Sequence, residues 1–209
     1  MPLFKTISIT GGLIGIWKFT ESVAELIPSF SEIELNDPNF RKYTHDKRRV
    51  EWLATRLLIR QLIDCDFTIE YLESGKPIIR HHQFKHLSIS HSREFAAVIL
   101  HKELNVGIDI EEISRDYNRI EKRFLSEEEL LYVAKNQSLQ CLFWCAKEAV
   151  FKLVEDDGID FKKQIHISDN QSKLTACFSC KKGQTNYVLH TTTFENNCLV
   201  WVVDSPVSK

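Results

Sequence analysis

Two carboxylates lie on one face of a predicted strand near the middle of the chain, in the segment NVGIDIEEI at residues 105–113. Side chains at positions i and i+2 of a strand point the same way, which puts Asp109 and Glu111 roughly 7 Å apart. At an effective dielectric constant near 20, the repulsion between them costs about 2 kcal/mol. A hard divalent cation would remove this repulsion, so the spacing favours a metal site.

A predicted helix over residues 139–154, LQCLFWCAKEAVFKLV, carries a second group of charged side chains. Its apolar residues recur at three- and four-residue spacing and form the stripe that faces the core. The opposite face carries Trp144, Glu148, Phe151 and Lys152. Aromatic residues mixed with charges indicate that a ligand or a second surface covers this face.

Glu148 and Lys152 have two interpretations. Taken alone, they form an ion pair one helical turn apart, which contributes about 0.2–0.5 kcal/mol to helix stability. Considered together with the two strand carboxylates and Lys147, they complete a set of three acids and two lysines. Such a set suits a magnesium-bound diphosphate.

The elements that must position these residues follow from hydrophobic periodicity. Helices are expected over residues 21–27, 46–64, 127–136 and 139–154. Strands are expected as a hairpin around Gly11–Gly12 and over residues 86–91, 96–101, 106–112, 173–180, 186–194 and 198–204. This order predicts an α/β (α+β) fold. We expect two subdomains, residues 1–101 and 102–209, with a cleft between them.

Composition excludes several classes of protein. A net charge of -2 and a pI near 6.5 give no overall attraction to nucleic acid. The apolar runs are shorter than the roughly 20 residues that a membrane helix needs, and no signal peptide is apparent. We therefore expect a cytoplasmic protein whose six cysteines are free thiols. Cys177 and Cys180 form a lone CxxC, a weak metal motif, and Cys141 and Cys145 suit helix packing.

The two charged segments together resemble a known family. VGIDIEE, followed about thirty residues later by FWCAKEAVFKL, resembles the paired signature of the 4'-phosphopantetheinyl transferase superfamily. GKP at 75–77 and SISHS at 88–92 precede them in the order expected for that family. The length resembles the two-lobed, monomeric branch typified by the surfactin-synthetase activator. The resemblance implies two similar α/β subdomains related by a pseudo-twofold axis.

The resemblance also implies an activity. Members transfer 4'-phosphopantetheine from coenzyme A to a serine of an apo acyl, peptidyl or polyketide carrier protein and release 3',5'-ADP. It implies Asp109, Glu111 and Glu148 as ligands of Mg²⁺, with Mn²⁺ as an alternative ion. The expected partners are thus coenzyme A and a carrier protein, without nucleic acid or membrane, and we expect a monomer. The alternatives are a non-catalytic carrier-protein or nucleotide-binding module and a magnesium-dependent hydrolase of nucleotide diphosphates.

The resemblance to this family implies catalytic roles for Glu129, Glu148 and Lys152. A base must take the proton of the serine hydroxyl, and the segment RFLSEEEL corresponds to the family segment that carries a base candidate. Its S-x-x-E spacing selects Glu129, with Glu127 and Glu128 as neighbours that could serve instead. The same spacing is a capping box with Ser126, and both interpretations stay open.

Coenzyme A binding by resemblance falls on basic and polar residues that come mainly from the N-terminal subdomain. The expected residues are Arg48, Arg56, Lys76, Ser90, His91, Lys147 and Lys152. Arg48 and Arg56 are eight residues apart, which places them on nearly the same helix face. Arg49 is the alternative to Arg48. The C-terminal subdomain is expected to supply the metal and catalytic residues.

Overall fold

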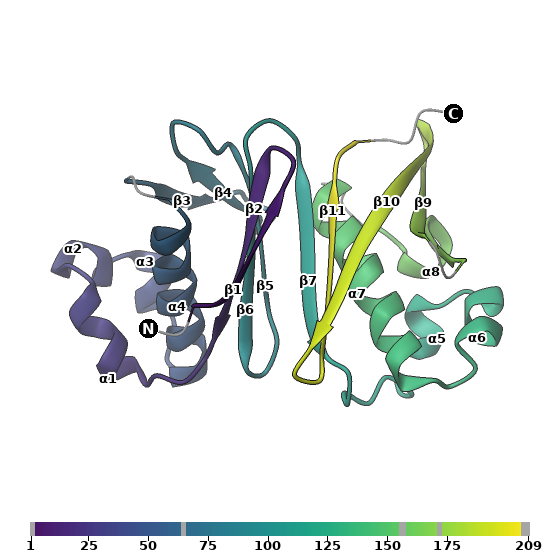
Figure 1. Cartoon of the computed structure of the whole chain (residues 1–209), viewed down its shortest axis with the longest axis horizontal. Coiled ribbons are helices and arrows are strands. Elements are labelled where there is room, and N and C mark those ends of the chain that lie inside the picture. Colours follow the sequence, from purple (N-terminus) through teal and green to yellow (C-terminus); the bar gives the residue numbers. More distant parts are fainter. Residues whose placement is uncertain (1–2, 64–65, 155–157, 171–172, 206–209) are drawn as a thin grey trace.

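The protein has a mixed α/β fold built on two antiparallel sheets (Figure 1). The structure is a computed structural model that describes residues 3–63, 66–154, 158–170 and 173–205. In the first sheet the strands run in the order β1 (Leu3–Ile9), β2 (Gly12–Lys18), β6 (Phe95–His101) and β5 (His86–His91). In the second they run β7 (Val106–Glu112), β11 (Asn197–Val203), β10 (Gly183–Phe194), β9 (Leu174–Cys180) and β8 (Ile165–Asp169).

Each sheet is covered by one long helix, and shorter elements complete each half. The long helices are α4 (Asp46–Leu62) and α7 (Gln137–Val154). The short helices are α1 (Val23–Leu26), α2 (Glu32–Leu35), α3 (Pro38–Arg41), α5 (Glu121–Phe124), α6 (Glu127–Val133) and α8 (Phe161–Gln164), with a 3₁₀ turn at Ile27–Ser29. A small ribbon pairs β3 (Thr68–Tyr71) with β4 (Pro77–Arg80). Among the described helices, none is both long and apolar enough to span a membrane.

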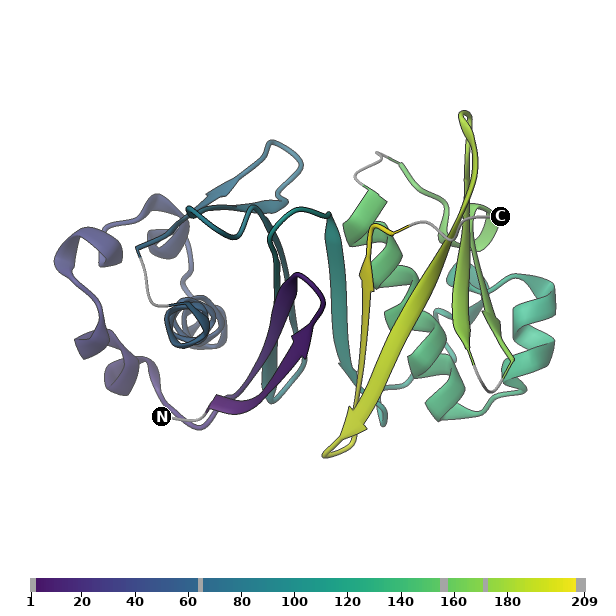
Figure 2. The same ribbon diagram turned by 45° about the horizontal axis from the view of Figure 1, so that its top comes forward.

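The molecule is layered as helix, sheet, sheet, helix (Figure 2). The two sheets pack against each other through a cluster that includes Ile14 and Ile16 of β2 and Ile108 and Ile110 of β7. Residues that alternate with these point outward, towards α4 on one side and α7 on the other. The strand β7 therefore directs its isoleucines into the central layer and its carboxylates towards α7.

The helix α7 approaches β7 at a glycine. A Cβ atom at Gly107 would lie 1.9 Å from the backbone oxygen of Ala149, closer than any atom can come. Glycine is therefore required for α7 to lie directly on β7. This close approach sets the height of the helix above Asp109, two residues further along the strand.

The edges of the two sheets are joined by serine hydroxyls. The backbone N–H of Ile108 donates to Ser88 Oγ at 3.2 Å, and that of Ile110 donates to Ser90 Oγ at 3.3 Å. Both serines are buried on β5, and both amides lie on β7. The seam brings the segment SISH next to the segment GIDIEE, although they are about twenty residues apart in sequence.

The expected elements form with small shifts in their ends. The hairpin at Gly11–Gly12 is confirmed, and the helix expected to reach residue 64 ends at Leu62. The capping box between Ser126 and Glu129 is confirmed at the start of α6. The three strands expected after residue 172 form as β9, β10 and β11. The division at residue 101 stays a prediction, because the two sheets share an apolar layer.

Candidate functional site

Asp109 lies at the centre of the candidate site. Its side chain is buried on β7, and its Oδ1 accepts hydrogen bonds from Ser90 Oγ at 2.6 Å and from Lys152 Nζ at 2.7 Å. Its other oxygen, Oδ2, is buried and has no hydrogen-bond partner. An ionised oxygen that is desolvated and unsatisfied is costly, and it is an available ligand for a cation.

Two further carboxylates lie close to Asp109. Burial, followed by the charge of Asp109, raises the pKa of Glu111 to about 7. The same two causes, in the same order, raise the pKa of Glu148 on α7 to about 7. Arg115 forms an ion pair with Glu111. The charge of Asp109 thus disfavours the ionisation of both glutamates, and Glu111 adds to the effect on Glu148.

Lys152 is the cation that the chain itself places among these acids. Its Nζ donates to the backbone oxygen of Ile108 at 3.0 Å as well as to Asp109. Glu148 lies one helical turn before it on α7, and the charge of Lys152 partly offsets the rise in the pKa of Glu148. Lys152 therefore offsets the charge of Asp109 and Glu148, while Arg115 offsets that of Glu111.

The donor set fits a hard divalent cation. Three carboxylates from two adjacent elements, one with an unpartnered buried oxygen, match the oxygen ligands that Mg²⁺ prefers. Their oxygens do not all lie within 4.8 Å of one another. Coordination by all three would therefore require Glu111 or Glu148 to change its side-chain rotamer.

A cavity of about 490 Å³ whose lining carries both basic and acidic side chains adjoins Glu111. Its walls come from both halves of the molecule. They carry the cations Lys47, Arg48, Arg93 and Arg115 and the acids Glu51, Glu111 and Glu112. Glu51 pairs with Lys47 and Arg48, and Glu111 pairs with Arg115. His91 also lines the cavity, whereas Arg49 does not; instead the Arg49 guanidinium stacks on Phe40. Of the two alternatives, Arg48 and Arg49, only Arg48 lines the same cavity as His91.

His91 is neutral at physiological pH. Burial, followed by the positive charge of Lys152, lowers its pKa to about 3. Its Nε2 is 2.9 Å from Thr55 Oγ1 on α4, and that hydroxyl donates to the backbone oxygen of Glu51 at 2.6 Å. Nε2 therefore donates to Thr55 if the hydroxyl proton is used by Glu51. The pair ties α4 to β5 at the edge of this cavity.

Two more cavities receive the remaining expected residues of the N-terminal half. Lys76 lines a cavity of about 560 Å³ together with Phe151 and Lys152 of α7. Arg56 is buried and stacks on the Trp52 ring at 3.4 Å, at the wall of a cavity of about 180 Å³ that His91 and Arg48 also line. Lys76 therefore lies in a cavity that both halves line, whereas the described lining of the Arg56 cavity comes from the N-terminal half.

Glu129 and Lys147 lie together in the core of the C-terminal half, away from this arrangement, and the roles expected for them stay predictions. Lys147 is fully buried and donates to Glu129 Oε2 at 2.7 Å and to two backbone oxygens, those of Phe161 and Ile165. Glu129 also accepts from the backbone N–H groups of Ser126 and Ile167, each at 2.8 Å. In this structure both side chains are enclosed and bonded to each other. The pair holds α6, α7 and β8 together.

Glu127 and Glu128, the neighbours of Glu129, are exposed on the first turn of α6. Ser90 is buried and donates to Asp109, so it positions a carboxylate and does not face a nucleotide. The sequence interpretation missed Ser88, whose hydroxyl accepts from the backbone of β7. The alternation of serine and isoleucine in SIS was the available signal, since polar residues at alternate positions share one face of a strand.

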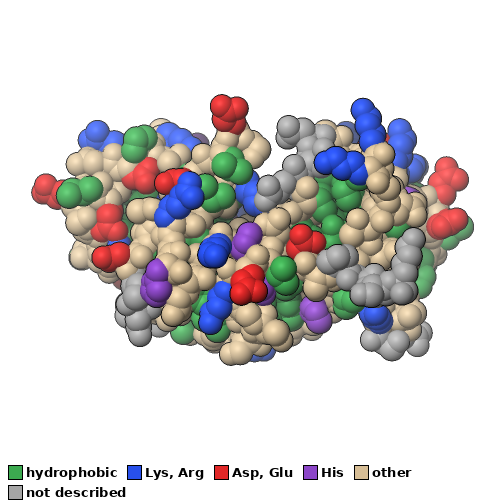
Figure 3. All heavy atoms as spheres, turned by 90° about the horizontal axis from the view of Figure 1, so that it is seen from above, with side chains coloured by type: hydrophobic (Ala, Val, Ile, Leu, Met, Phe, Trp, Pro, Cys, Tyr) green, Lys and Arg blue, Asp and Glu red, His purple; other side chains and the backbone are tan. Residues whose placement is uncertain are grey.

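Charge on the surface is mixed rather than segregated. Figure 3 shows basic, acidic and histidine side chains interspersed across the upper face of the molecule. No field of one sign covers that face, in agreement with a net charge of -2. Recognition of an anion would therefore depend on local groups of cations such as Arg48 and Arg93.

Comparison with known proteins gives a match to a family model and similarity to solved structures. The model of the 4'-phosphopantetheinyl transferase superfamily (ACPS) matches residues 105–200, just under half of the chain. The match supports this superfamily. It spans β7 and α7, which carry all three carboxylates. The surfactin-synthetase-activator branch stays a prediction.

Among solved structures, the chain is similar to the crystal structure of Thermotoga maritima holo-[acyl-carrier-protein] synthase (AcpS). The two are 22% identical with a TM-score of 0.40, over 47% of this chain and 61% of that one. The chain therefore matches less than two thirds of the length of that protein. No sequence among the curated proteins matches this chain.

Proposed function

We propose that the protein transfers 4'-phosphopantetheine from coenzyme A to a serine of an apo carrier protein and releases 3',5'-ADP. The observation that carries this proposal is the cluster of Asp109, Glu111 and Glu148 around Lys152, beside cavities with basic residues in their walls. The superfamily match over residues 105–200 supports phosphopantetheinyl transfer in general. The carrier protein can belong to fatty acid, polyketide or peptide synthesis.

The basic residues of the cleft bind coenzyme A in this proposal. Arg48 and the neighbouring cations Lys47 and Arg93 attract phosphate, and His91, whose Nε2 is engaged with Thr55, lines the same cavity. Lys76 and Lys152 flank the second cavity and bind the other end of the same ligand. Mg²⁺ or Mn²⁺ held by the three carboxylates would neutralise charge on the diphosphate.

Glu148 is the base in this proposal. It is half-buried at the cleft, beside Lys152, whereas Glu129 is enclosed in the core. The serine oxygen forms a bond to the phosphorus that bears the pantetheine arm, and Glu148 takes the serine proton. The bond from that phosphorus to the bridging oxygen breaks, and its electrons leave with 3',5'-ADP. Lys152 holds Asp109 in place throughout.

Intact-protein mass spectrometry tests the proposal. Apo carrier proteins of the acyl, peptidyl and polyketide types are each incubated with this protein, coenzyme A and Mg²⁺, and in parallel with a chelator. We expect at least one carrier to gain the mass of one phosphopantetheine only when the metal is present. Unchanged masses for every carrier would contradict the proposal and favour a non-catalytic module.

A further inference from the structure

Three cysteine side chains meet inside the C-terminal half. Cys141 and Cys145 lie one turn apart on α7, and Cys198 lies on β11. Their sulfur atoms all lie within 4.8 Å of one another, and each residue is 0–2% exposed. Among the described residues, no other three His, Cys, Asp or Glu side chains bring their ligand atoms this close together. The carboxylates of the candidate site are more widely spread.

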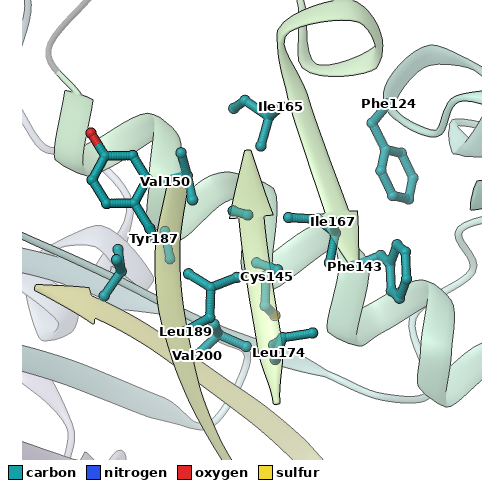
Figure 4. Close-up of a cluster of buried hydrophobic side chains, with 14 of the residues drawn as sticks. Phe124, Phe143, Cys145, Val150, Ile165, Ile167, Leu174, Tyr187, Leu189 and Val200 are labelled. Carbon is teal, nitrogen blue, oxygen red and sulfur yellow. The ribbon is translucent and has the colours of Figure 1, made fainter. Parts of the chain in front are cut away.

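The surroundings of the sulfurs are mostly apolar, with a few polar contacts. Figure 4 shows Cys145 among buried aliphatic side chains, which include Leu189 and Val200. The Tyr117 hydroxyl donates to Cys141 Sγ at 3.3 Å. The thiol of Cys145 donates to the backbone oxygen of Cys198 at 3.6 Å. The site is therefore dry, with a hydroxyl that can stabilise a thiolate.

Packing alone explains why small cysteines are buried, but not why three sulfurs converge from two elements. Around a single cation with metal–sulfur bonds of about 2.3 Å, the sulfurs lie about 3.8–4.0 Å apart. The three thiols need only a small contraction to reach this spacing. Thiolate sulfur selects soft cations such as Zn²⁺ and Cu⁺ over hard ones such as Mg²⁺.

We propose that Cys141, Cys145 and Cys198 form a binding site for one thiophilic d¹⁰ cation, Zn²⁺, Cd²⁺ or Cu⁺, separate from the carboxylate cluster. Each thiolate that forms releases one proton to solvent. A divalent cation bound by all three thiolates releases three protons and leaves a net charge of -1 at the site, towards which the Tyr117 hydroxyl donates a hydrogen bond.

The cysteine cluster and the carboxylate cluster are held by the same helix, α7, and by the paired strands β7 and β11. Cys198 is paired with Glu111 across β11 and β7, and Cys141 Sγ is 3.8 Å from the Glu111 backbone oxygen. Cys145 precedes Glu148 by three residues on α7. A test must therefore separate sulfur ligation from binding at the carboxylates, and excess Mg²⁺ does this because hard cations prefer oxygen.

The test uses the full chain with Cys65, Cys177 and Cys180 replaced by serine, which leaves only the three clustered thiols. Cd²⁺ is the probe, because sulfur-to-cadmium charge transfer absorbs in the ultraviolet and oxygen ligation does not. It is added to the folded protein and, separately, before refolding, since the site is buried. With excess Mg²⁺ present we expect one Cd²⁺ per chain, with the charge-transfer band and a higher Tm.

Matched variants in the same background are Cys141→Ser, Cys145→Ser and Cys198→Ser, each checked for native circular dichroism. We expect each folded variant to lose the band and the rise in Tm and to bind Cd²⁺ at least 100-fold more weakly, which corresponds to about 2.8 kcal/mol. Absence of the band from the three-thiol protein under both protocols would overturn the proposal. So would undiminished binding in any of the folded variants.

Discussion

Asp109 is the residue on which the candidate site depends most. One of its oxygens is shared by Ser90 and Lys152, and the other is buried without a partner. The chain has thus oriented this carboxylate fully while leaving one ligand atom available. Pre-organisation of this kind is typical of a group that must meet a cation in a fixed geometry.

The substitution Asp109→Asn tests this role. The amide oxygen of the new side chain could still accept from Ser90 and Lys152, so we expect native circular dichroism and a Tm within a few degrees of wild type. We expect kcat/KM for transfer to fall by about 10²–10³, as when a preorganised electrostatic contact to a reacting phosphate is lost. The control is Asp46→Asn, at an exposed position on the first turn of α4. A near-normal rate for the Asp109 variant would exclude it from the reaction centre.

The raised pKa values of Glu111 and Glu148 predict a pH dependence of stability. Both are about 7 in the folded protein, against an ordinary 4.5, so the folded state binds protons more tightly than the unfolded state between these values. Protonation of the two glutamates therefore stabilises the folded protein as the pH falls through 7, and this stabilisation is lost as the pH rises above 7. His91 has the opposite shift, from 6.5 to about 3, so it begins to oppose this gain near pH 6.5.

In metal-free buffer we therefore expect the Tm to rise as the pH is lowered from about 8.5 to about 6.5. Glu148→Gln should raise the Tm at the upper pH by about 2–4 °C, roughly 1 kcal/mol in a chain of this size, and flatten the profile. Differential scanning calorimetry measures both. If Glu148→Gln lowers the Tm at high pH, the carboxylate is stabilising rather than strained.

The buried Glu129–Lys147 pair predicts a structural effect. Removal of one partner leaves an uncompensated charge in the core, which costs about 3–5 kcal/mol. We expect Lys147→Met to lower the free energy of unfolding by this amount in urea titrations. The double variant Glu129→Gln, Lys147→Met should recover much of the loss, because no unpaired charge remains. Equal losses in the single and double variants would contradict the assignment.

At the scale of single residues, the acids and Lys152 could be predicted from their motifs, because spacing fixes which face each one occupies. The role of Glu129 could not be decided from the sequence. A capping-box glutamate and a base occupy the same position, and only the enclosure of Glu129 by Lys147 and Ile167 separates the two. The sequence likewise held no sign that Ser90 binds a carboxylate, since its partner lies on another strand.

At the scale of elements, the contact between β7 and α7 determines the geometry of the site. Gly107 permits this contact, since a side chain there would meet the backbone of Ala149. Backbone atoms cannot move aside as the end of a side chain can. The distance between Asp109 on the strand and Glu148 on the helix therefore depends on this one glycine.

Gly107→Ala is expected to displace α7 from β7, to destabilise the protein by about 1–3 kcal/mol as overpacking does, and to reduce transfer disproportionately. Gly15→Ala is the matched control on β2, where the added Cβ would meet only the side-chain ends of Leu58 and Leu62 on α4, at 2.8 Å. Unfolding in urea and kcat measure the two effects. Equal effects on kcat from both substitutions would show that the β7–α7 contact has no special role.

Most elements could be predicted because periodicity specifies which face is buried. The sequence did not predict the contact between β5 and β7. There the edge strands of the two sheets are joined by serine side chains and not by backbone hydrogen bonds. Alternation of polar and apolar residues indicates which face of a strand is buried, but it does not indicate which element lies beside the edge of that strand.

At the scale of the whole molecule, the two halves meet through an apolar layer and both line cavities that carry charged side chains. The cavities draw residues from both halves, so neither half alone would form the candidate site. The sequence predicted an α/β protein with a cleft. It could not predict that the two sheets would pack face to face. An apolar strand face can pack equally well against a helix or against a second sheet, and the sequence does not distinguish the two.

The central claim is that the reaction is centred on the carboxylate cluster with Glu148, and not on Glu129. The most direct measurement compares single-turnover rates of phosphopantetheine transfer by Glu148→Gln and Glu129→Gln, followed by intact mass of the carrier protein. Rates are expressed per folded molecule. We predict a loss of at least 10²-fold for Glu148→Gln, as for the loss of a catalytic base, and a rate within about threefold of wild type for Glu129→Gln. The reverse order would contradict the account.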